Sequence, residues 1–405
     1  MHATVDQEIR ELIHKHGRIT FAQFMQTCLY SPHGGFYAAR SARINTHFGT
    51  SPTSHPAFGT LIARQLEQMW HLLGDPPVFH VLEVGCGDGA LAQAIVQACT
   101  QMASPLAQAL HYVAADYAPR WSQAPDYTVA RSRGPGDAVS PGRQDTRGRV
   151  QRVRTAGLQG FRQIVGCILC NELIDNFPVH RFAIQHGRVK EVFVTLTAGQ
   201  FTEVLDEPSS PRIAERLASV GVFPATARAV GGQCHGTPSL PEGFRGEVNL
   251  AVEDWTGQLA SALERGFVLT IDYGQLAPAL YAPRHNQGTL MCYHRHVASH
   301  DPYQHLGQQD ITCQVDFTSL MRLGEQHGLA TAGYTLQRQF LMNLGFASLL
   351  EALQTQGLSA ARLELSRMAM MTLVDPDEYG DFKVLAQAKG QGLDTKLLGF
   401  QPQAT

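Results

Sequence analysis

The sequence predicts an α/β fold: a doubly wound, mostly parallel sheet with an N-terminal helical cap and an inserted segment. Two observations predict it. Apolar runs of strand length recur along the chain, which is typical of parallel strands buried on both faces. The first of these runs is followed by closely spaced glycines and then by a helical pattern of apolar residues. Strand, turn and helix in this order indicate a doubly wound sheet.

The glycine-rich turn follows the apolar run at 79–84 and contains Gly85, Gly87 and Gly89, with Glu83 two residues before the first glycine. Glycines let the backbone approach a ligand where a Cβ atom would collide. An acid at this place suits a ligand with a cationic head, such as S-adenosyl-L-methionine. The same glycines together with Ala90 also satisfy the G-x-G-x-x-A pattern of NAD or FAD sites. Both cofactors, and a purely structural turn, stay open at this point.

Four segments organise the chain. Residues 1–75 form a helical cap, 76–180 the first part of the core, 181–245 an inserted hairpin or cap, and 246–405 the remainder, with a loop insertion at 280–310. In the cap, one helix is expected around residues 9–13, a second from Thr20 and a third over 58–73. In the core we expect strands at 79–84, 111–115, 164–169 and 266–271, and a helix at 89–100. The stretch Arg131–Arg154 is rich in Gly, Pro and Arg and predicts a solvated loop.

Polar residues follow the predicted strands, and strand carboxyl ends in such a sheet face the ligand crevice. Asp116 follows the second strand, where an acid typically binds ribose hydroxyls; a helix N-cap is the alternative. Asn171, Glu172 and Asp175 follow the third strand. Two carboxylates and an amide after a buried strand are hard to explain as core, although one of them can be a cap. Asp272 follows the fourth strand, either at the crevice or in a structural turn.

Two polar loops stand apart from the strands. Thr50, Ser51 and Pro52 precede a helix and offer hydroxyl groups to a ligand, with plain N-capping as the alternative. The second loop, within 294–305, holds four histidines at irregular spacing. That spacing does not fit a metal site, so we expect a solvated loop and no metal.

Composition excludes several classes of protein. The chain has 405 residues and a net charge of −3, which does not favour a nucleic-acid partner. No apolar run is long enough for membrane insertion. Cys167 and Cys170 form the one C-x-x-C pair, inside an apolar run, where buried thiols are expected rather than zinc ligands. Reduced thiols and the absence of a targeting pattern at the N-terminus lead us to expect a cytoplasmic, bacterial protein.

Taken together, the ordered motifs resemble the MidA-like family of class I S-adenosyl-L-methionine-dependent methyltransferases. The resemblance runs from about residue 19 to 390. The motifs that carry it are Leu29-Tyr30-Ser31-Pro32, Gly35-Phe36-Tyr37, Thr50-Ser51-Pro52, Glu83-x-Gly85-x-Gly87-x-Gly89, Asn171-Glu172-x-x-Asp175-x-x-Pro178-Val179-His180, Ile271-Asp272-Tyr273-Gly274 and Asp310-Ile311-Thr312-x-x-Val315-Asp316-Phe317. One departure is that the family's second strand commonly ends in Glu, where this chain has Ala114 and then Asp116.

The resemblance implies a Rossmann-like core and S-adenosyl-L-methionine as cofactor. The expected cofactor contacts are Glu83, Gly85, Gly87, Gly89, Asp116, Asn171, Thr50, Ser51 and Pro52. Mitochondrial members are respiratory complex I assembly factors that methylate an arginine of a complex I subunit, which implies a protein substrate. Two alternatives from other classes are an NAD-dependent oxidoreductase and a non-catalytic assembly factor. Oligomeric state is not readable from the sequence.

A carboxylate pair is the catalytic machinery that we expect. Guanidinium stays protonated at neutral pH, and two carboxylate oxygens can grip its fork and leave one nitrogen exposed. Glu172, paired with Asp175 or Asp272, is the candidate. Methyl transfer is an in-line displacement, so positioning of the two reactants supplies most of the catalysis.

Overall fold

The computed structural model describes residues 4–38, 50–117, 127–128, 150–155, 157–224, 239–393 and 396–401. The chain forms two compact units, each assembled from three segments. Unit 1 comprises 1–48, 174–255 and 274–323, and unit 2 comprises 49–173, 256–273 and 324–405. The chain therefore passes repeatedly between the units. Of the four segments expected from the sequence, 181–245 lies within unit 1, and the other three are divided between the units.

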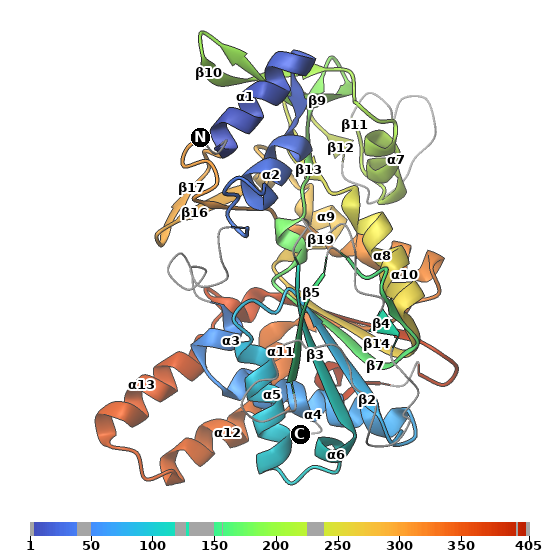
Figure 1. The fold of residues 1–405 in the computed structure, drawn as a ribbon, viewed down its shortest axis with the longest axis vertical. Helices are drawn as coiled ribbons and strands as arrows, with labels where there is room; N and C mark the ends of the chain where they lie inside the picture. The colour runs from blue at the N-terminus through green and yellow to red at the C-terminus, as the bar shows by residue number, and fades with distance from the viewer. Residues whose placement is uncertain are drawn as a thin grey trace. The chain divides into compact units, whose positions relative to one another are not determined.

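A seven-stranded sheet forms the centre of unit 2 (Figure 1). Its strands, in spatial order, are β20 (Ala330–Leu336), β21 (Lys383–Lys389), β14 (Leu263–Asp272), β7 (Ile164–Asn171), β2 (Phe79–Val84), β3 (Leu110–Tyr117) and β5 (Val150–Thr155). Neighbours from β14 to β5 are parallel, and β21 runs antiparallel to both β14 and β20. The four strands expected from the sequence are confirmed, and the α/β fold with them.

The strand order contains a topological switch. From β2 the chain continues to β3 and β5 on one side, and it then returns to form β7 on the other side of β2. In doubly wound sheets, ligands bind beyond the strand carboxyl ends at such a switch point. The carboxyl ends of β2 and β7 are where the glycine turn and Asn171-Glu172 lie, so topology brings these two motifs to one place.

Helices cover the sheet of unit 2. They are α3 (Ser51–Ser54), α4 (Ala57–Leu72), α5 (Ala90–Gln101), α6 (Leu106–Ala109), α11 (Gln337–Asn343), α12 (Phe346–Ala352) and α13 (Ala360–Met371). The main core lies between the sheet and the long helices, with fully buried Phe58, Phe79 and Phe267 among its members. A short pair of strands, β4 (Tyr127–Thr128) and β6 (Phe161–Arg162), lies apart from the main sheet. The expected helices at 58–73 and 89–100 are confirmed within a residue or two.

Unit 1 is built mainly on antiparallel strands, with two short parallel ladders. Its larger sheet contains β1 (Ile19–Thr20), β8 (His180–Gln185), β9 (Arg188–Thr197), β10 (Gln200–Asp206) and β13 (Arg245–Val248). Smaller ladders are formed by β16 (Met291–His294), β17 (Val297–Ser299) and β18 (Asp310–Thr312), by β15 (Gly274–Gln275) with β19 (Val315–Asp316), and by β11 (Phe223–Pro224) with β12 (Ser239–Leu240). The hairpin expected in the inserted segment 181–245 is formed by β8 and β9.

Unit 1 contains six α-helices among the described residues, two of which continue into unit 2. They are α1 (Val5–His16), α2 (Phe21–Tyr30), α7 (Arg212–Ser219) and α9 (Ala277–Leu280), while α8 (Ala251–Ala262) and α10 (Phe317–Gln326) continue into unit 2. Thr20 caps α2: its hydroxyl accepts from the Gln23 amide, and the Gln23 side chain accepts from the Thr20 amide. This reciprocal capping satisfies two otherwise unpaired amides and fixes the start of the helix that the sequence predicts at Thr20.

One expectation is wrong. Residues 131–149 lie outside the described residues, but Val150–Thr155 is β5, a full strand of the main sheet rather than the end of a solvated loop. The strand was not expected because its arginines interrupt the apolar pattern. Arginines are tolerated there because β5 lies at the edge of the sheet, beside β3. Among the described residues, no helix is long and apolar enough to cross a membrane.

Candidate functional site

The glycine turn connects β2 to α5 through three residues in the left-handed region. The φ angles of Gly85, Gly87 and Gly89 are 78°, 51° and 82°. The amides of Gly85 and Cys86 both donate to the carbonyl of Ala115 on β3, at 2.9 and 3.2 Å, which ties the turn to the neighbouring strand. A Cβ atom on Gly87 would have no described atom within 4 Å. The backbone is therefore accessible at Gly87, as a ligand-binding turn requires.

Glu83 lies at the end of β2 and is 4% exposed. Its Oε2 accepts a hydrogen bond from the Tyr112 hydroxyl at 2.8 Å. Burial raises the pKa of Glu83 to about 7, although the Tyr112 hydrogen bond and the nearby charge of Arg152 oppose the rise. A carboxyl group with this pKa changes protonation near neutral pH, so its ability to attract a cationic ligand head depends on pH.

Asp116 lies at the carboxyl end of β3, in register with Arg154 of β5. Burial raises its pKa above the ordinary value, and the charges of Arg154 and Arg152 oppose the rise. The charge of Asp116 also contributes to the raised pKa of Cys86, in the glycine turn. Asp116 thus lies close to the turn, where a ribose ligand is expected to be.

The carboxyl end of β7 carries a strained residue. Glu172 has a φ of 48°, which is uncommon for any residue other than glycine, asparagine or aspartate and costs of order 1–3 kcal/mol. Its amide donates to the carbonyl of Ile271 on β14 at 2.9 Å, and its half-buried carboxylate accepts from the Asn171 side chain at 3.1 Å. Asn171 itself is buried, and its Oδ1 has no partner among the described residues. A buried acceptor without a described partner, next to a residue with a strained backbone, is typical of a ligand site.

The Thr50-Ser51-Pro52 loop contacts this place directly. The Ser51 amide, at the first residue of α3, donates to Glu172 Oε1 at 3.1 Å. Ser51 is fully buried, and its hydroxyl accepts a hydrogen bond from the Gln337 side-chain amide at 3.3 Å. Gln337 also donates to the Leu373 carbonyl at 3.0 Å, while its own Oε1 has no partner among the described residues. The sequence offered no signal for Gln337, because it stands alone at the start of α11.

Asp272 is fully buried at the end of β14. Its Oδ2 accepts from the Leu173 amide at 3.2 Å, and its Oδ1 accepts from the Tyr273 amide at 2.9 Å. Both contacts brace the turns that follow β7 and β14. Asp272 therefore has a structural role in holding these two turns. The catalytic role expected of it stays a prediction.

Asp175 belongs to unit 1, although only two residues separate it from Glu172. It is buried, its carbonyl accepts from the Cys313 amide at 3.0 Å, and it lies near a second acid, Asp310. Burial and the charge of Asp175 raise the pKa of Asp310 to about 8. The Asp310 carboxyl group is also bonded to the Tyr37 hydroxyl at 3.0 Å and to the Asn176 amide at 2.9 Å. Three motifs of the resemblance thus meet at this buried acidic cluster.

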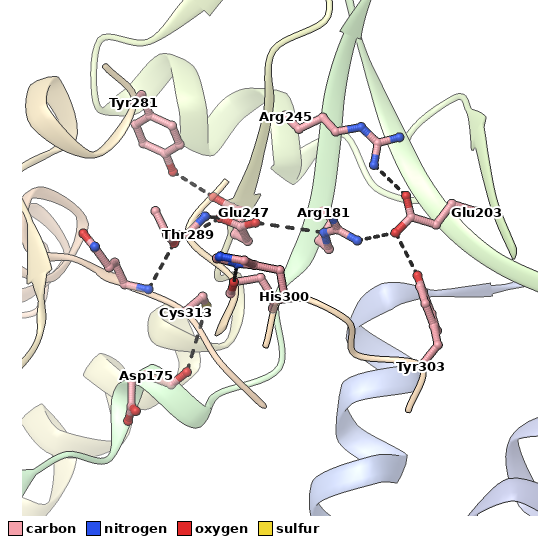
Figure 2. A network of polar contacts seen from close by, with 12 residues as sticks. Asp175, Arg181, Glu203, Arg245, Glu247, Tyr281, Thr289, His300, Tyr303 and Cys313 are labelled. Carbon is pink, nitrogen blue, oxygen red and sulfur yellow. Dashed lines mark hydrogen bonds and ion pairs between the residues drawn. The ribbon is translucent and has the colours of Figure 1, made fainter. Parts of the chain in front are cut away.

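A second polar network in unit 1 consists of paired charges (Figure 2). Arg181 donates to Glu203, which also accepts from Arg245 at 2.6 Å and from the Tyr303 hydroxyl at 2.9 Å. On its other side, Arg181 lies 4.0 Å from the buried carboxylate of Glu247. Figure 2 shows these groups in one continuous row that joins β8, β10 and β13 to the loop before β18.

The histidine-rich segment is also part of unit 1, and the loop expected there is partly a hairpin, because His294 ends β16 and β16 pairs with β17. His294 and His305 stack with ring centroids 4.1 Å apart, and His300 donates to the Leu290 carbonyl at 3.0 Å. The described ranges contain no group of three or more metal-ligating side chains. Backbone and stacking contacts therefore account for the conformation of this segment.

The structure divides the predicted site residues as follows. Unit 2 contains all of them but one: Thr50, Ser51, Pro52, Glu83, Gly85, Gly87, Gly89, Asp116, Asn171, Glu172 and Asp272. Asp175 is the exception. The sequence reasoning missed Gln337 and Arg152; the guanidinium of Arg152 binds the glycine turn from β5.

Comparison with known proteins identifies similar chains. The sequence profile of a family described as S-adenosyl-L-methionine-dependent methyltransferases matches residues 61–335, more than half of the chain. The protein arginine methyltransferase NDUFAF7 homolog of Drosophila melanogaster is 26% identical, over 96% of this chain and 86% of its own length. The human protein arginine methyltransferase NDUFAF7 is 25% identical, over 95% and 84%. Both relatives are mitochondrial.

Solved structures agree with the sequence relatives. A protein from Burkholderia thailandensis, crystallised with S-adenosyl-homocysteine, superposes with a TM-score of 0.75 at 25% identity, over 98% of this chain and 94% of the other. A native crystal structure from the same organism gives a TM-score of 0.77 at 26% identity and the same coverage. Of the cofactors that the glycine pattern left open, these comparisons support S-adenosyl-L-methionine.

Proposed function

Because the chain belongs to the MidA-like family of S-adenosyl-L-methionine-dependent methyltransferases, we propose that its methyl acceptor is an arginine side chain of a protein. Two relatives that match nearly the whole chain are named protein arginine methyltransferases, and this supports arginine as the acceptor. The observation that carries the proposal is Glu172 at the switch point of the sheet, a half-buried residue with a strained backbone.

The cofactor fits the residues at the switch point. The glycine turn has open space at Gly87, and Asn171 offers a buried acceptor with no partner among the described residues. We assign the cofactor to the turn at 85–89, with Glu83 toward its cationic head, Asp116 toward its ribose and Asn171 as a further acceptor. When bound, S-adenosyl-L-methionine supplies an electrophilic methyl group on a sulfonium centre.

Glu172 is suited to hold the acceptor. A guanidinium is a planar cation with five donors and a pKa above 12, so a carboxylate binds it strongly when water is excluded. The Ser51 amide and the Asn171 side chain both bond Glu172 Oε1, which fixes the carboxylate in one orientation. A fixed carboxylate aligns one nitrogen for in-line attack on the methyl group and compensates the positive charge of the guanidinium. Asp272 braces the turn behind it.

Labelled methyl transfer tests the proposal. The purified chain is incubated with methyl-labelled S-adenosyl-L-methionine and a cell lysate, and the labelled species is identified by mass spectrometry. We expect label on arginine of a protein. Label on a small molecule, or on another side chain only, would reject the proposed acceptor while leaving methyl transfer established.

Two variants of Glu172 then test its role. Glu172→Gln keeps size but removes charge; we expect little change in cofactor affinity and at least a tenfold loss of methyl transfer, about 1.4 kcal/mol of transition-state stabilisation. Glu172→Gly relieves the left-handed strain, so it should retain thermal stability while losing transfer. Glu264→Gln, at an exposed position on β14, is the matched control. Unchanged transfer in both Glu172 variants would show that the residue is structural.

A further inference from the structure

Arg152 binds the glycine turn from two strands away. Its Nη2 donates to the Gly87 carbonyl at 2.7 Å, and its Nη1 donates to the Asp88 carbonyl at 2.8 Å. One guanidinium thus holds two successive peptide groups of the turn. A Cβ atom on Gly89 would lie 3.1 Å from the guanidinium carbon, so the glycine leaves the space that the arginine fills.

The strand register explains how Arg152 reaches the turn. Glu83 of β2 is paired with Ala114 of β3, and Ala114 is paired with Arg152 of β5. Paired residues of adjacent strands point to the same face of a sheet, so these three side chains form one row. Ala114 is the small member in the middle, and it lets the long arginine side chain pass over β3 to the end of β2.

The two hydrogen bonds also orient the amides of the turn. In a planar trans peptide, the carbonyl and the following amide point in opposite directions. With the Gly87 carbonyl directed at Arg152, the Asp88 amide points to the other side of the turn. Amides held in a fixed direction at the start of a helix, here α5, bind ligands at a lower entropic cost than mobile ones.

We propose that Arg152 is a positioning residue that holds the glycine turn in its cofactor-binding conformation. It acts through the Gly87 and Asp88 carbonyls rather than by contact with the cofactor. This inference rests on the proposed placement of the cofactor at residues 85–89. The inference also gives β5, the strand that was not expected from the sequence, a role in cofactor binding.

Calorimetric binding of S-adenosyl-homocysteine tests the proposal with four variants of the full chain. Arg152→Met keeps much of the side-chain bulk without donors, Arg152→Lys keeps a charge and a single donor group, and Arg162→Met removes an exposed arginine of β6 as the matched control. Gly87→Val tests the placement of the cofactor itself. Thermal midpoints are measured for each, together with hydrogen exchange of the peptide spanning the turn.

We expect Arg152→Met to weaken binding by about tenfold and to speed amide exchange in the turn, with a thermal midpoint within a few degrees of wild type. Arg152→Lys should regain part of the affinity, and Arg162→Met should bind as wild type does. The inference is overturned if Arg152→Met binds with wild-type affinity, if the lysine variant is as weak as the methionine variant, or if Arg162→Met weakens binding equally. Wild-type affinity in Gly87→Val would overturn the placement of the cofactor, and this inference with it. Loss of binding in Gly87→Val combined with full affinity in Arg152→Met would overturn the inference alone.

Discussion

Near the glycine turn of unit 2, Asp272 and Arg152 bond to backbone groups, whereas in unit 1 the charges around Arg181 bond mainly to one another. Asp272 accepts from two backbone amides, and Arg152 donates to two backbone carbonyls. Arg181 of unit 1 lies instead between the carboxylates of Glu203 and Glu247, and Glu203 also forms an ion pair with Arg245.

The difference determines how each unit responds to substitution. A side chain that bonds to the backbone shapes a loop, so its loss is expected to change ligand binding more than global stability. Removing one member of a buried ion network leaves another charge without its partner. That buried, unpaired charge lowers the free energy of unfolding of the whole protein. Four predictions test this comparison.

The largest effect is expected at Arg181. Arg181→Met leaves the buried Glu247 carboxylate without its nearest cation, and burial already raises the pKa of Glu247. We expect the free energy of unfolding to fall by about 3 kcal/mol, as measured by chemical denaturation. Arg212→Met removes an exposed ion pair with Glu253 and should cost less than about 1 kcal/mol. Equal losses in the two variants would contradict the role given to the network.

Gly87→Val is expected to abolish cofactor binding, at a cost in stability of about 1–3 kcal/mol from the strained backbone that the control variant shares. A valine is strained at a φ of 51°, and its side chain projects into the open space at the turn. We expect affinity for S-adenosyl-homocysteine to fall more than a hundredfold, about 2.7 kcal/mol or more, by calorimetry. Gly199→Val is the control, because Gly199 has a similar φ of 81° and open space but lies in unit 1. Loss of binding in the control as well would point to general unfolding.

Asp116→Ala is expected to have a smaller effect on the same equilibrium. If Asp116 binds the ribose hydroxyls, its removal loses charge-assisted hydrogen bonds of about 1.5–3 kcal/mol, and affinity falls roughly tenfold to a hundredfold. Unchanged affinity would place the ribose contact on another residue. Asp116→Asn keeps the shape of the side chain and separates the effect of charge from that of hydrogen bonding.

The smallest difference to be measured is a pH dependence in unit 1, of about 1 kcal/mol between pH 6 and 7. The pKa of Asp310 is raised to about 8, so the folded chain keeps a proton that the unfolded chain releases near pH 4. This contribution to stability is full below about pH 4 and is lost as the pH rises toward 8, at up to about 1.4 kcal/mol per pH unit. Asp310→Asn should flatten that decline, by about 1 kcal/mol between pH 6 and 7. Denaturation of both proteins at several pH values measures it, and parallel curves would refute the assignment.

The parts of the molecule that could be predicted from the sequence are those fixed by local patterns. The strand at Phe79–Val84 and the start of α2 after Thr20 are as expected, because continuous apolar runs and caps act over a few residues. β20 and β21 were missed, since β21 interleaves lysine and glutamine with apolar residues, and its burial comes from strands distant in the chain.

The candidate site follows the same division. Its glycine turn and the carboxylate at Glu172 could be predicted from residue type and spacing. The tasks of Asp272 and Arg152 could not, because Asp272 is bonded to an amide 99 residues away and Arg152 to a carbonyl 65 residues away. The left-handed backbone of Glu172 also has no sequence signal, since the sequence there contains no glycine.

The position of β21 has a consequence for synthesis of the chain. This strand is the last of the seven to leave the ribosome, yet it pairs with β14 on one side and β20 on the other. Until it emerges, the exposed edge of β14 is an aggregation-prone template. The nascent chain must therefore carry the open edge of β14 from residue 272 until residues 383–389 have been made. We expect slow maturation to be governed by the arrival of residues 383–389 rather than by the folding of β2, β3 and β7.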